Sequence, residues 1–177
     1  MKRLLELELR DSNIFPGTQD VDPAGFRERR AVRAVVLNNL GQVALLWVEN
    51  YNHHELPGGG VEKEDGGDLR RTLGREVLEE LGCEVEVIDK VGTIIEYEGR
   101  ISKLRISDCF LAKQVGQVMQ PRFTQKEIAD GQEIRWAEDI HDAIATVEAD
   151  QPNDYVGQFI QVRELAFLRA AALLLHS

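Results

Sequence analysis

The chain has 177 residues, and its 31 acidic side chains outnumber its 21 basic ones, which gives a formal net charge of −10. Hydrophobic residues make up 43% of the sequence, enough for one compact domain with an ordinary core. The negative charge argues against a large basic surface, so we expect neither a nucleic-acid polymer nor a membrane as a partner. The chemistry must therefore be sought in a local site.

Cysteine usage and hydropathy indicate the compartment. Cys83 and Cys109 are the only cysteines, and without Cys-x-x-Cys spacing they are expected to be free thiols rather than zinc ligands. The first six residues become charged too early for a secretory signal. The longest apolar runs, residues 43–48 and 170–175, are too short to span a membrane. The predicted location is the cytoplasm.

Residues 1–28 are predicted to form an N-terminal arm. Residues 5–9 alternate leucine and glutamate, which is typical of a strand, and a turn-rich stretch follows. We place a boundary after this arm, so that residues 29–177 form the main domain. An accessory strand can also pair with its copy in a second chain, and a homodimer is therefore one option.

The next elements are strands and a glycine-rich loop. Residues 31–37 and 43–48 are apolar and separated by a turn, which predicts a hairpin of largely buried strands. Three consecutive glycines, residues 58–60, cannot lie inside a regular element. They indicate a loop whose backbone can approach a ligand closely.

A helix is predicted over residues 69–81, where apolar residues recur at helical spacing. Asp68 is a suitable N-cap, and Gly82 is typical of a helix end. Residues 85–97 and 101–112 are expected to form a second hairpin.

The last third of the chain begins with a long polar loop over residues 113–132. A short strand over residues 133–136 and helices over residues 137–147 and 155–175 are expected to follow. Strands on both sides of a central helix, followed by terminal helices, predict a mixed α/β sandwich rather than a doubly wound parallel sheet.

Three glutamates of the central helix carry the strongest chemical signal. Glu76, Glu79 and Glu80 project within an arc of roughly 100° on the helical wheel. Such like charges repel each other, whereas a hard divalent cation would turn the repulsion into ligation. The alternative is an ordinary solvated helix face, which predicts no metal dependence.

The order of these features resembles the Nudix box. Residues 58–62 supply its glycines, and residues 75–83 match its second half, Arg-Glu-aliphatic-x-Glu-Glu-x-Gly, with Cys83 in place of the final aliphatic residue. The resemblance covers about residues 30–177. It implies an α/β fold, the Nudix-type α/β/α sandwich with a mixed β-sheet.

The box departs from the family pattern in one place. Its first glutamate falls at Gly67 when counted back from Arg75, and at Asp65 when counted forward from Gly59. A two-residue insertion in the loop explains the difference. Glu64, Asp65 and Asp68 are all candidates for the missing acidic residue.

The resemblance implies roles for the box residues. Glu76, Glu79 and Glu80 would coordinate Mg²⁺, with Mn²⁺ as an alternative, and the carbonyl oxygen of Gly58 could add a ligand. Arg75 would hold a box carboxylate in place. Glu79, Glu80 and Arg75 are thus the predicted catalytic residues.

The general base is predicted either in the box or on the distant polar loop. Glu127 is our choice on the loop, and Asp130 and Glu133 are the other candidates there.

Three residues outside the box are predicted to contact the substrate. Tyr51 could stack on a nucleobase, and His54 precedes the glycine loop, where a polar residue at a strand entrance is the equally good alternative. Arg105 alternates with apolar residues, as Arg100 and Lys103 do. These cations suit phosphate, but charges that protect an edge strand would explain them equally well.

The predicted function is that of a Mg²⁺-dependent Nudix pyrophosphohydrolase, in which water attacks a phosphorus of the diphosphate linkage. A small molecule, either a nucleoside triphosphate or another nucleoside diphosphate derivative, is the expected substrate. The alternative is a non-catalytic Nudix-fold domain that binds a nucleotide as a sensor.

Overall fold

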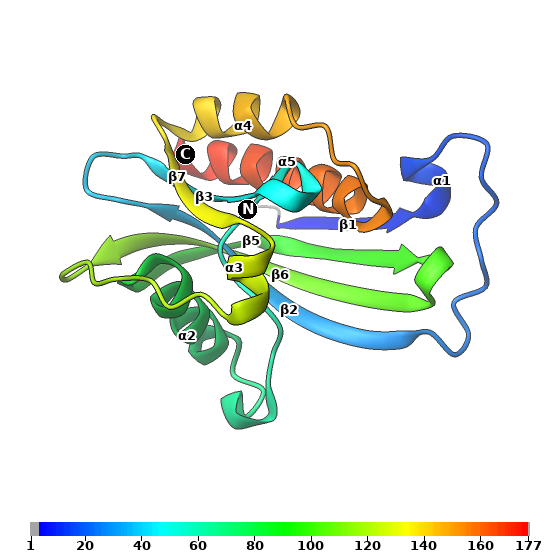
Figure 1. Ribbon diagram of the computed structural model, residues 1–177, viewed down its shortest axis with the longest axis horizontal. Coiled ribbons are helices and arrows are strands. Elements are labelled where there is room, and N and C mark those ends of the chain that lie inside the picture. The colour runs from blue at the N-terminus through cyan, green and yellow to red at the C-terminus, as the bar shows by residue number, and fades with distance from the viewer. Residues whose placement is uncertain (1–3, 177) are drawn as a thin grey trace.

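The computed structural model describes residues 4–176 and shows one mixed sheet between two layers of helices (Figure 1). Its strands are β1 (Leu5–Arg10), β2 (Arg27–Leu37), β3 (Val43–Val48), β4 (His53–Glu55), β5 (Glu84–Glu98), β6 (Lys103–Val115) and β7 (Gln132–Ala137). Its α-helices are α1 (Asp11–Ile14), α2 (Leu69–Leu81), α3 (Gln125–Ala129), α4 (Ile140–Glu148) and α5 (Tyr155–Leu175).

The sheet has seven strands in the order β1-β5-β6-β2-β3-β4, and β7 pairs with β3. Two of its pairs are parallel, β1 with β5 and β2 with β6, and the other pairs are antiparallel. Helix α2 covers one face of the sheet, whereas α4 and α5 cover the other (Figure 1). The predicted α/β/α sandwich with a mixed sheet is confirmed.

Helix α2 begins and ends where the sequence predicts. The Asp68 side chain accepts hydrogen bonds from the backbone N–H groups of Arg70 and Arg71, and Gly82 ends the helix at φ 68° in the left-handed region. Leu73 and Val77 are fully buried against the sheet. Each such side chain stabilises the packing by about 1.5–3 kcal/mol, which fixes the glutamate-bearing turns relative to β2.

On the opposite face, α5 packs Phe159 and Phe167 into the second core. Cys109 lies in this core and Cys83 in the one under α2; both are buried free thiols, as predicted. Among residues 4–176, no helix combines the length and the apolar character needed to cross a lipid bilayer.

The first predicted hairpin is confirmed, because β2 and β3 are antiparallel neighbours, but their pairing is short. β2 and β3 meet only at the Leu37–Val43 pair, whereas β2 runs parallel to β6 over its whole length. Apolar runs identify buried strands but not their neighbours, and an interior strand such as β2 has a partner on each side. β6 is likewise interior, because it lies between β5 and β2.

Two other segments refine the prediction. The predicted long polar loop over residues 113–132 contains a short helix, α3, which is stabilised by a reciprocal capping box between Thr124 and Glu127. In the predicted N-terminal arm, β1 pairs in parallel with β5 from Leu5 to Arg10. The first three residues of that arm lie outside the described residues.

Candidate active site

The glycine loop between β4 and α2 is pinned against β2. Its backbone oxygens at Pro57 and Gly59 each accept a hydrogen bond of 2.9 Å, from the N–H groups of Ala34 and Val32. Gly58 has a φ of 141°, and a Cβ there would lie 2.1 Å from the carbonyl oxygen of Val32. Only glycine fits this position, on both conformational and steric grounds.

The carboxylates of α2 lie directly against this loop. The Gly58 N–H donates to Glu80 over 2.7 Å. The Glu76 carboxyl is so close to Gly59 that a Cβ on that glycine would lie 2.5 Å from its oxygen. The glycines therefore make the space in which two of the three predicted metal-binding carboxylates meet the loop.

Burial changes the acidity of both carboxyls. It raises the pKa of Glu80 well above the usual value, against the opposing hydrogen bond from Gly58 and the charge of Arg33. Burial also raises the pKa of Glu76, although Arg75 opposes the shift. Neighbouring carboxylates add to both shifts, so the site is short of positive charge.

Arg75 connects the box carboxylates to the preceding loop. Its guanidinium contacts Glu76 at 2.8 Å and Glu79 at 3.7 Å, and it donates to Asp65 at 3.0 and 3.2 Å. It also reaches the carbonyl oxygen of Gly60 at 3.2 Å. Arg75 is thus the centre of an ion-pair network and not an exposed helix arginine.

These contacts favour Asp65 as the residue that replaces the first box glutamate. Asp65 is 3% exposed and also accepts hydrogen bonds from Thr72 and from the Glu62 N–H. Its contact with Arg75, above all, holds the pKa of Asp65 below its usual range. Of the other candidates, Asp68 caps α2 and Glu64 is exposed.

The donor set fits a hard divalent cation. Glu76, Glu79 and Glu80 form what we call the carboxylate cluster, and two of them lack sufficient compensating charge. Within residues 4–176, no three acidic, histidine or cysteine side chains converge as a ready metal cage. Arg75 and the Gly58 N–H occupy carboxylate oxygens that a cation would share, so ligation requires small side-chain rotations.

Arg33 is a site residue that the sequence analysis missed. It is 6% exposed on β2 and donates to the carbonyl oxygen of Gly58 over 2.8 Å, and it lies 3.7 Å from Glu55. The signal was present, because one charged residue stands inside the apolar run over residues 31–37 and a buried charge needs a partner. Arg33 thus holds the carbonyl group proposed as a metal ligand.

The loop acids have local partners. Glu127 accepts a 2.6 Å hydrogen bond from the Thr124 N–H, and Asp130 contacts Lys126 at 2.6 Å. Glu133 pairs with Arg135. None of these contacts involves a residue of the box.

The predicted substrate residues are separated in the fold. His54 is 4% exposed, with its Nδ1 2.8 Å from Asp150, so its side chain is held beneath the surface. Tyr51 lines a cavity of about 260 Å³ with Lys126. Arg105 instead lines a cavity of about 370 Å³ that reaches Gly60 of the glycine loop.

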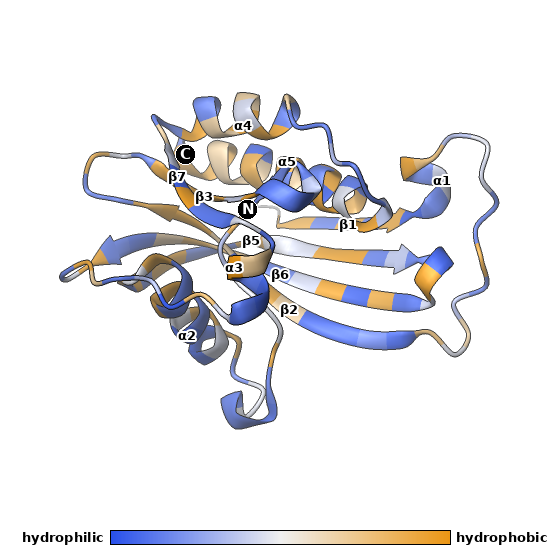
Figure 2. Ribbon diagram, in the orientation of Figure 1, coloured by the Kyte–Doolittle hydropathy of each residue, from blue (hydrophilic) through white to orange (hydrophobic). Residues whose placement is uncertain are grey.

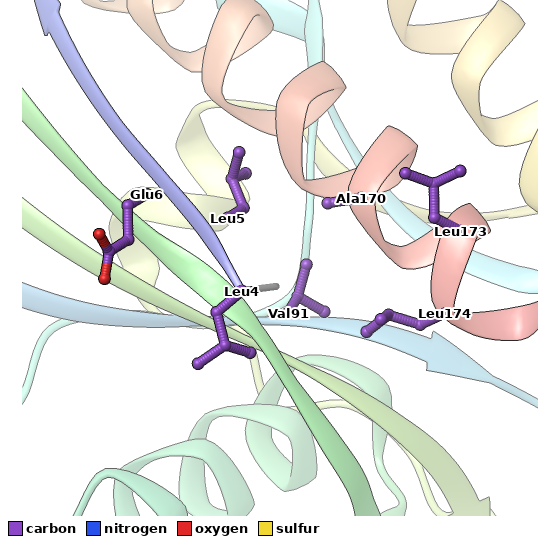
Figure 3. Close-up of a pocket in the computed structure, with 7 residues that line it drawn as sticks. All are labelled: Leu4, Leu5, Glu6, Val91, Ala170, Leu173 and Leu174. Carbon is purple, nitrogen blue, oxygen red and sulfur yellow. The ribbon is translucent and has the colours of Figure 1, made fainter. Parts of the chain in front are cut away.

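A wider cavity of about 630 Å³ lies between β1 and the end of α5 (Figure 3). It has a single charged lining residue, Glu6, and is otherwise apolar, so it lacks the groups that phosphate chemistry requires. Its lining residues are Leu4, Leu5, Glu6, Val91, Ala170, Leu173 and Leu174. We therefore place the candidate active site at the glycine loop.

Comparison with known proteins decides the family. The model of the NUDIX domain matches residues 27–155, which include the glycine loop and the whole of α2. The chain belongs to the NUDIX domain family. A relative from Pseudoalteromonas translucida (strain TAC 125), an RNA pyrophosphohydrolase, is 37% identical over 75 residues. That match covers 41% of this chain and 40% of the relative's length.

Solved Nudix structures share the fold. An Ap4A hydrolase from C. elegans superimposes with a TM-score of 0.57 at 19% identity, over 84% of this chain and 99% of that one. A UDP-X diphosphatase gives 0.55 at 18% identity, covering 90% and 68%. The MutT protein from Methanosarcina mazei Go1 gives 0.53 at 22% identity, covering 83% and 97%. Their names differ in substrate, so the fold alone does not identify the substrate of this protein.

Proposed function

We propose that this protein is a Mg²⁺-dependent pyrophosphohydrolase that cleaves the diphosphate linkage of a nucleoside diphosphate derivative. The observation that carries the proposal is the contact between the carboxylate cluster and the glycine loop, where Glu80 accepts a hydrogen bond from Gly58. The family match and the pyrophosphohydrolase relative support the class of reaction.

The side chains of the site have distinct tasks in this reaction. Glu76, Glu79 and Glu80 would hold Mg²⁺, with Mn²⁺ as a substitute. When bound, such a cation neutralises phosphate charge and lowers the pKa of a water molecule. Asp65 fixes Arg75, and Arg75 fixes the rotamer of Glu76. Arg33 fixes the carbonyl group of Gly58.

The deciding experiment measures release of phosphate or nucleoside monophosphate from a nucleotide panel, with Mg²⁺ and with a chelator. Glu79→Gln should lower kcat by more than about 100-fold, because even residues that only support metal ligands cost 10–100-fold when they are lost. Glu84→Gln, an exposed glutamate just beyond α2, is the matched control and should retain activity. Turnover that survives both the chelator and Glu79→Gln would contradict the proposal.

The sensor alternative predicts a different result in the same assay. A nucleotide would then bind in a Mg²⁺-dependent way without being cleaved, and Glu79→Gln would weaken binding. The intact carboxylate cluster and the pyrophosphohydrolase relative favour hydrolysis over the sensor. The cytoplasmic location and the homodimer remain predictions, and light scattering would decide the second.

A further inference from the structure

A pocket of about 370 Å³ beside the glycine loop is lined by five cationic side chains and one glutamate. This is unexpected for a chain in which acidic residues outnumber basic ones by 31 to 21. Figure 2 shows that β2 is hydrophilic at its N-terminal end, where this pocket lies, and hydrophobic further on. We call it the basic pocket, and its cations are Arg27, Arg29, Arg33, Lys103 and Arg105.

The strand register forces these cations together. In the parallel pair of β2 and β6, Arg27 stands beside Lys103, and Arg29 stands beside Arg105. Neighbouring strands are about 4.8 Å apart, so like charges on one face repel each other. The parallel pairing of β2 and β6 thus places two pairs of like charges next to each other. A bound anion would remove this repulsion.

Among the described residues, three of the cations have no carboxylate within hydrogen-bond or ion-pair distance, although Glu98 acts on Lys103 from further away. The side chains of Arg27, Arg29 and Lys103 form no hydrogen bond or ion pair with any residue between 4 and 176. Burial, followed by the charge of Arg105, lowers the pKa of Lys103. The positive charge of the pocket is therefore largely uncompensated.

The remaining two cations, Arg33 and Arg105, are held in place by hydrogen bonds to buried groups. Glu98, which is fully buried, accepts hydrogen bonds from Arg105 at 3.2 and 3.3 Å. Arg33 is 6% exposed, and its Nε is buried without a hydrogen-bond partner. Arg33 thus combines a place in the pocket lining with a hydrogen-bonding capacity that its buried neighbours do not fill.

The pocket is continuous with the candidate active site. A Cβ on Gly60 would lie 2.7 Å from a guanidinium nitrogen of Arg29, so this arginine packs on the glycine loop. Arg33 touches both the pocket and the carbonyl oxygen of Gly58. An edge-strand role for the cations of β6 is wrong, because β6 is interior.

We propose that the basic pocket binds the additional phosphates of a free nucleotide that carries three or more phosphates in a chain. A substrate held by the carboxylate cluster at one phosphate would extend the rest of its chain over Gly60 into the pocket. A nucleoside diphosphate sugar would place a neutral sugar among uncompensated cations and leave them unpaired. The inference rests on the proposed function for the cleavage step but not for the binding of the anion.

The first test measures binding of inorganic tripolyphosphate by calorimetry, without divalent cations, so that the carboxylate cluster contributes nothing. The pocket variant, Arg29→Gln with Lys103→Gln, should bind at least about tenfold more weakly, the loss expected from one charge-assisted hydrogen bond. Arg135→Gln with Arg169→Gln removes the same net charge from exposed positions and should bind like the wild type. Equal binding by the wild type and the pocket variant would overturn the proposal.

The second test compares kcat/KM for ATP and diadenosine tetraphosphate with kcat/KM for UDP-glucose and ADP-ribose. The wild type should have the higher kcat/KM for the longer phosphate chains. In the pocket variant this ratio of kcat/KM values should fall about tenfold, because KM for the longer chains rises. An unchanged preference overturns the proposal. Faster cleavage of a 5′-triphosphate RNA than of ATP overturns the assignment to a free nucleotide.

The two tests separate the inference from the proposed function. If no compound is cleaved but tripolyphosphate binding depends on the pocket cations, the anion pocket stands and the hydrolase proposal falls. Because the pocket variant removes repulsion between neighbouring cations, it should melt no lower than the wild type, which checks that it folds. Arg27→Gln alone provides a second, smaller change at the pocket rim.

Discussion

The carboxylate cluster and the basic pocket lie on either side of the glycine loop and are opposite in charge. The cluster has three carboxylates and one close cation, Arg75, whereas three cations of the pocket have no carboxylate partner. Neither region is compensated within itself. This contrast supports both proposals, a cation bound on one side of the loop and an anion on the other.

The two regions also differ in how they are built. The carboxylate cluster lies on one helix, so its geometry follows from local spacing in the sequence. The basic pocket depends on the register of β2 against β6, strands separated by more than sixty residues. Buried ion pairs connect it to α5, because Arg105 lies 3.7 Å from Glu96, which pairs with Arg163 of that helix. The pocket should therefore be the more sensitive of the two to changes in the distant core.

The largest expected effect tests these buried ion pairs. Arg163 is fully buried on α5 and contacts Glu96 at 3.1 Å and Glu164 at 2.8 Å. Burial disfavours its charge, but the two carboxylates outweigh burial and raise its pKa. Arg163→Met leaves Glu164 buried without its partner and leaves Glu96 with only Arg105 at 3.7 Å, which should cost about 3–5 kcal/mol in the free energy of unfolding.

Chemical denaturation measures this loss. Arg169→Met, which breaks the exposed pair with Glu148, is the matched control on the same helix and should cost less than about 1 kcal/mol. Equal losses in the two variants would mean that the buried ion pairs of Arg163 stabilise the fold no more than an exposed pair does.

The second prediction concerns the loop that separates the two regions. Gly58→Ala combines a disfavoured φ of 141° with a clash against the Val32 carbonyl group, so it should cost roughly 2–5 kcal/mol. Gly67→Ala shares a positive φ, 78°, but meets nothing within 4 Å, and backbone strain alone costs about 1–2 kcal/mol. Thermal unfolding should rank Gly58→Ala clearly below Gly67→Ala. The reverse order would mean that the loop is not pressed against β2.

The third prediction sharpens the picture of the carboxylate cluster. Asp65→Asn weakens the hold on Arg75, so the apparent Mg²⁺ affinity should fall by about 10–100-fold, as for other residues that orient metal ligands. Glu64→Gln, its exposed neighbour in the same turn, should leave the Mg²⁺ dependence unchanged. Activity measured against Mg²⁺ concentration separates the two variants. A lower kcat with unchanged Mg²⁺ dependence would contradict the positioning role of Asp65.

The contrast between the regions explains what the sequence could predict. Helix α2, its cap Asp68 and its glutamates follow from local rules, and the predicted helix was confirmed from Leu69 to Leu81. The family and the sandwich fold were confirmed as well. The choice of Asp65 over its acidic neighbours was beyond the sequence, because it depends on how a two-residue insertion folds towards Arg75.

The sequence indicated only some of the cations that line the basic pocket. Lys103 and Arg105 stood out by their alternation, but Arg27 and Arg29 belong to a strand whose parallel pairing no local pattern indicates. The predicted hairpin correctly gave β3 as one neighbour of β2 but did not reveal β6 as the other. Long-range register decides which cations share a face, and it emerges only when both cores are packed.

The smallest expected effect is a pH dependence of stability. It comes from His53 and Glu55, which lie outside both the carboxylate cluster and the basic pocket. His53 is 2% exposed, and its Nε2 lies 2.9 Å from Glu55. Burial lowers the pKa of His53, but the hydrogen bond and charge of Glu55, with Asp154, outweigh it and raise the pKa above 6.5. Burial would raise the pKa of Glu55, yet His53 and Arg33 lower it from 4.5 to about 2.

The directions of the two pKa shifts define the pH range in which His53 and Glu55 both stabilise the folded protein. The contribution of His53 is complete below its ordinary pKa of 6.5 and is lost as the pH rises through the raised value in the folded protein. The contribution of Glu55 is present above 4.5 and is lost as the pH falls through about 2. His53→Gln should therefore cost more free energy of unfolding at about pH 5.5 than at about pH 8.5. His141→Gln, exposed on α4, should show no such difference, and an equal cost of His53→Gln at both pH values would mean that His53 is held neutral beneath the loop.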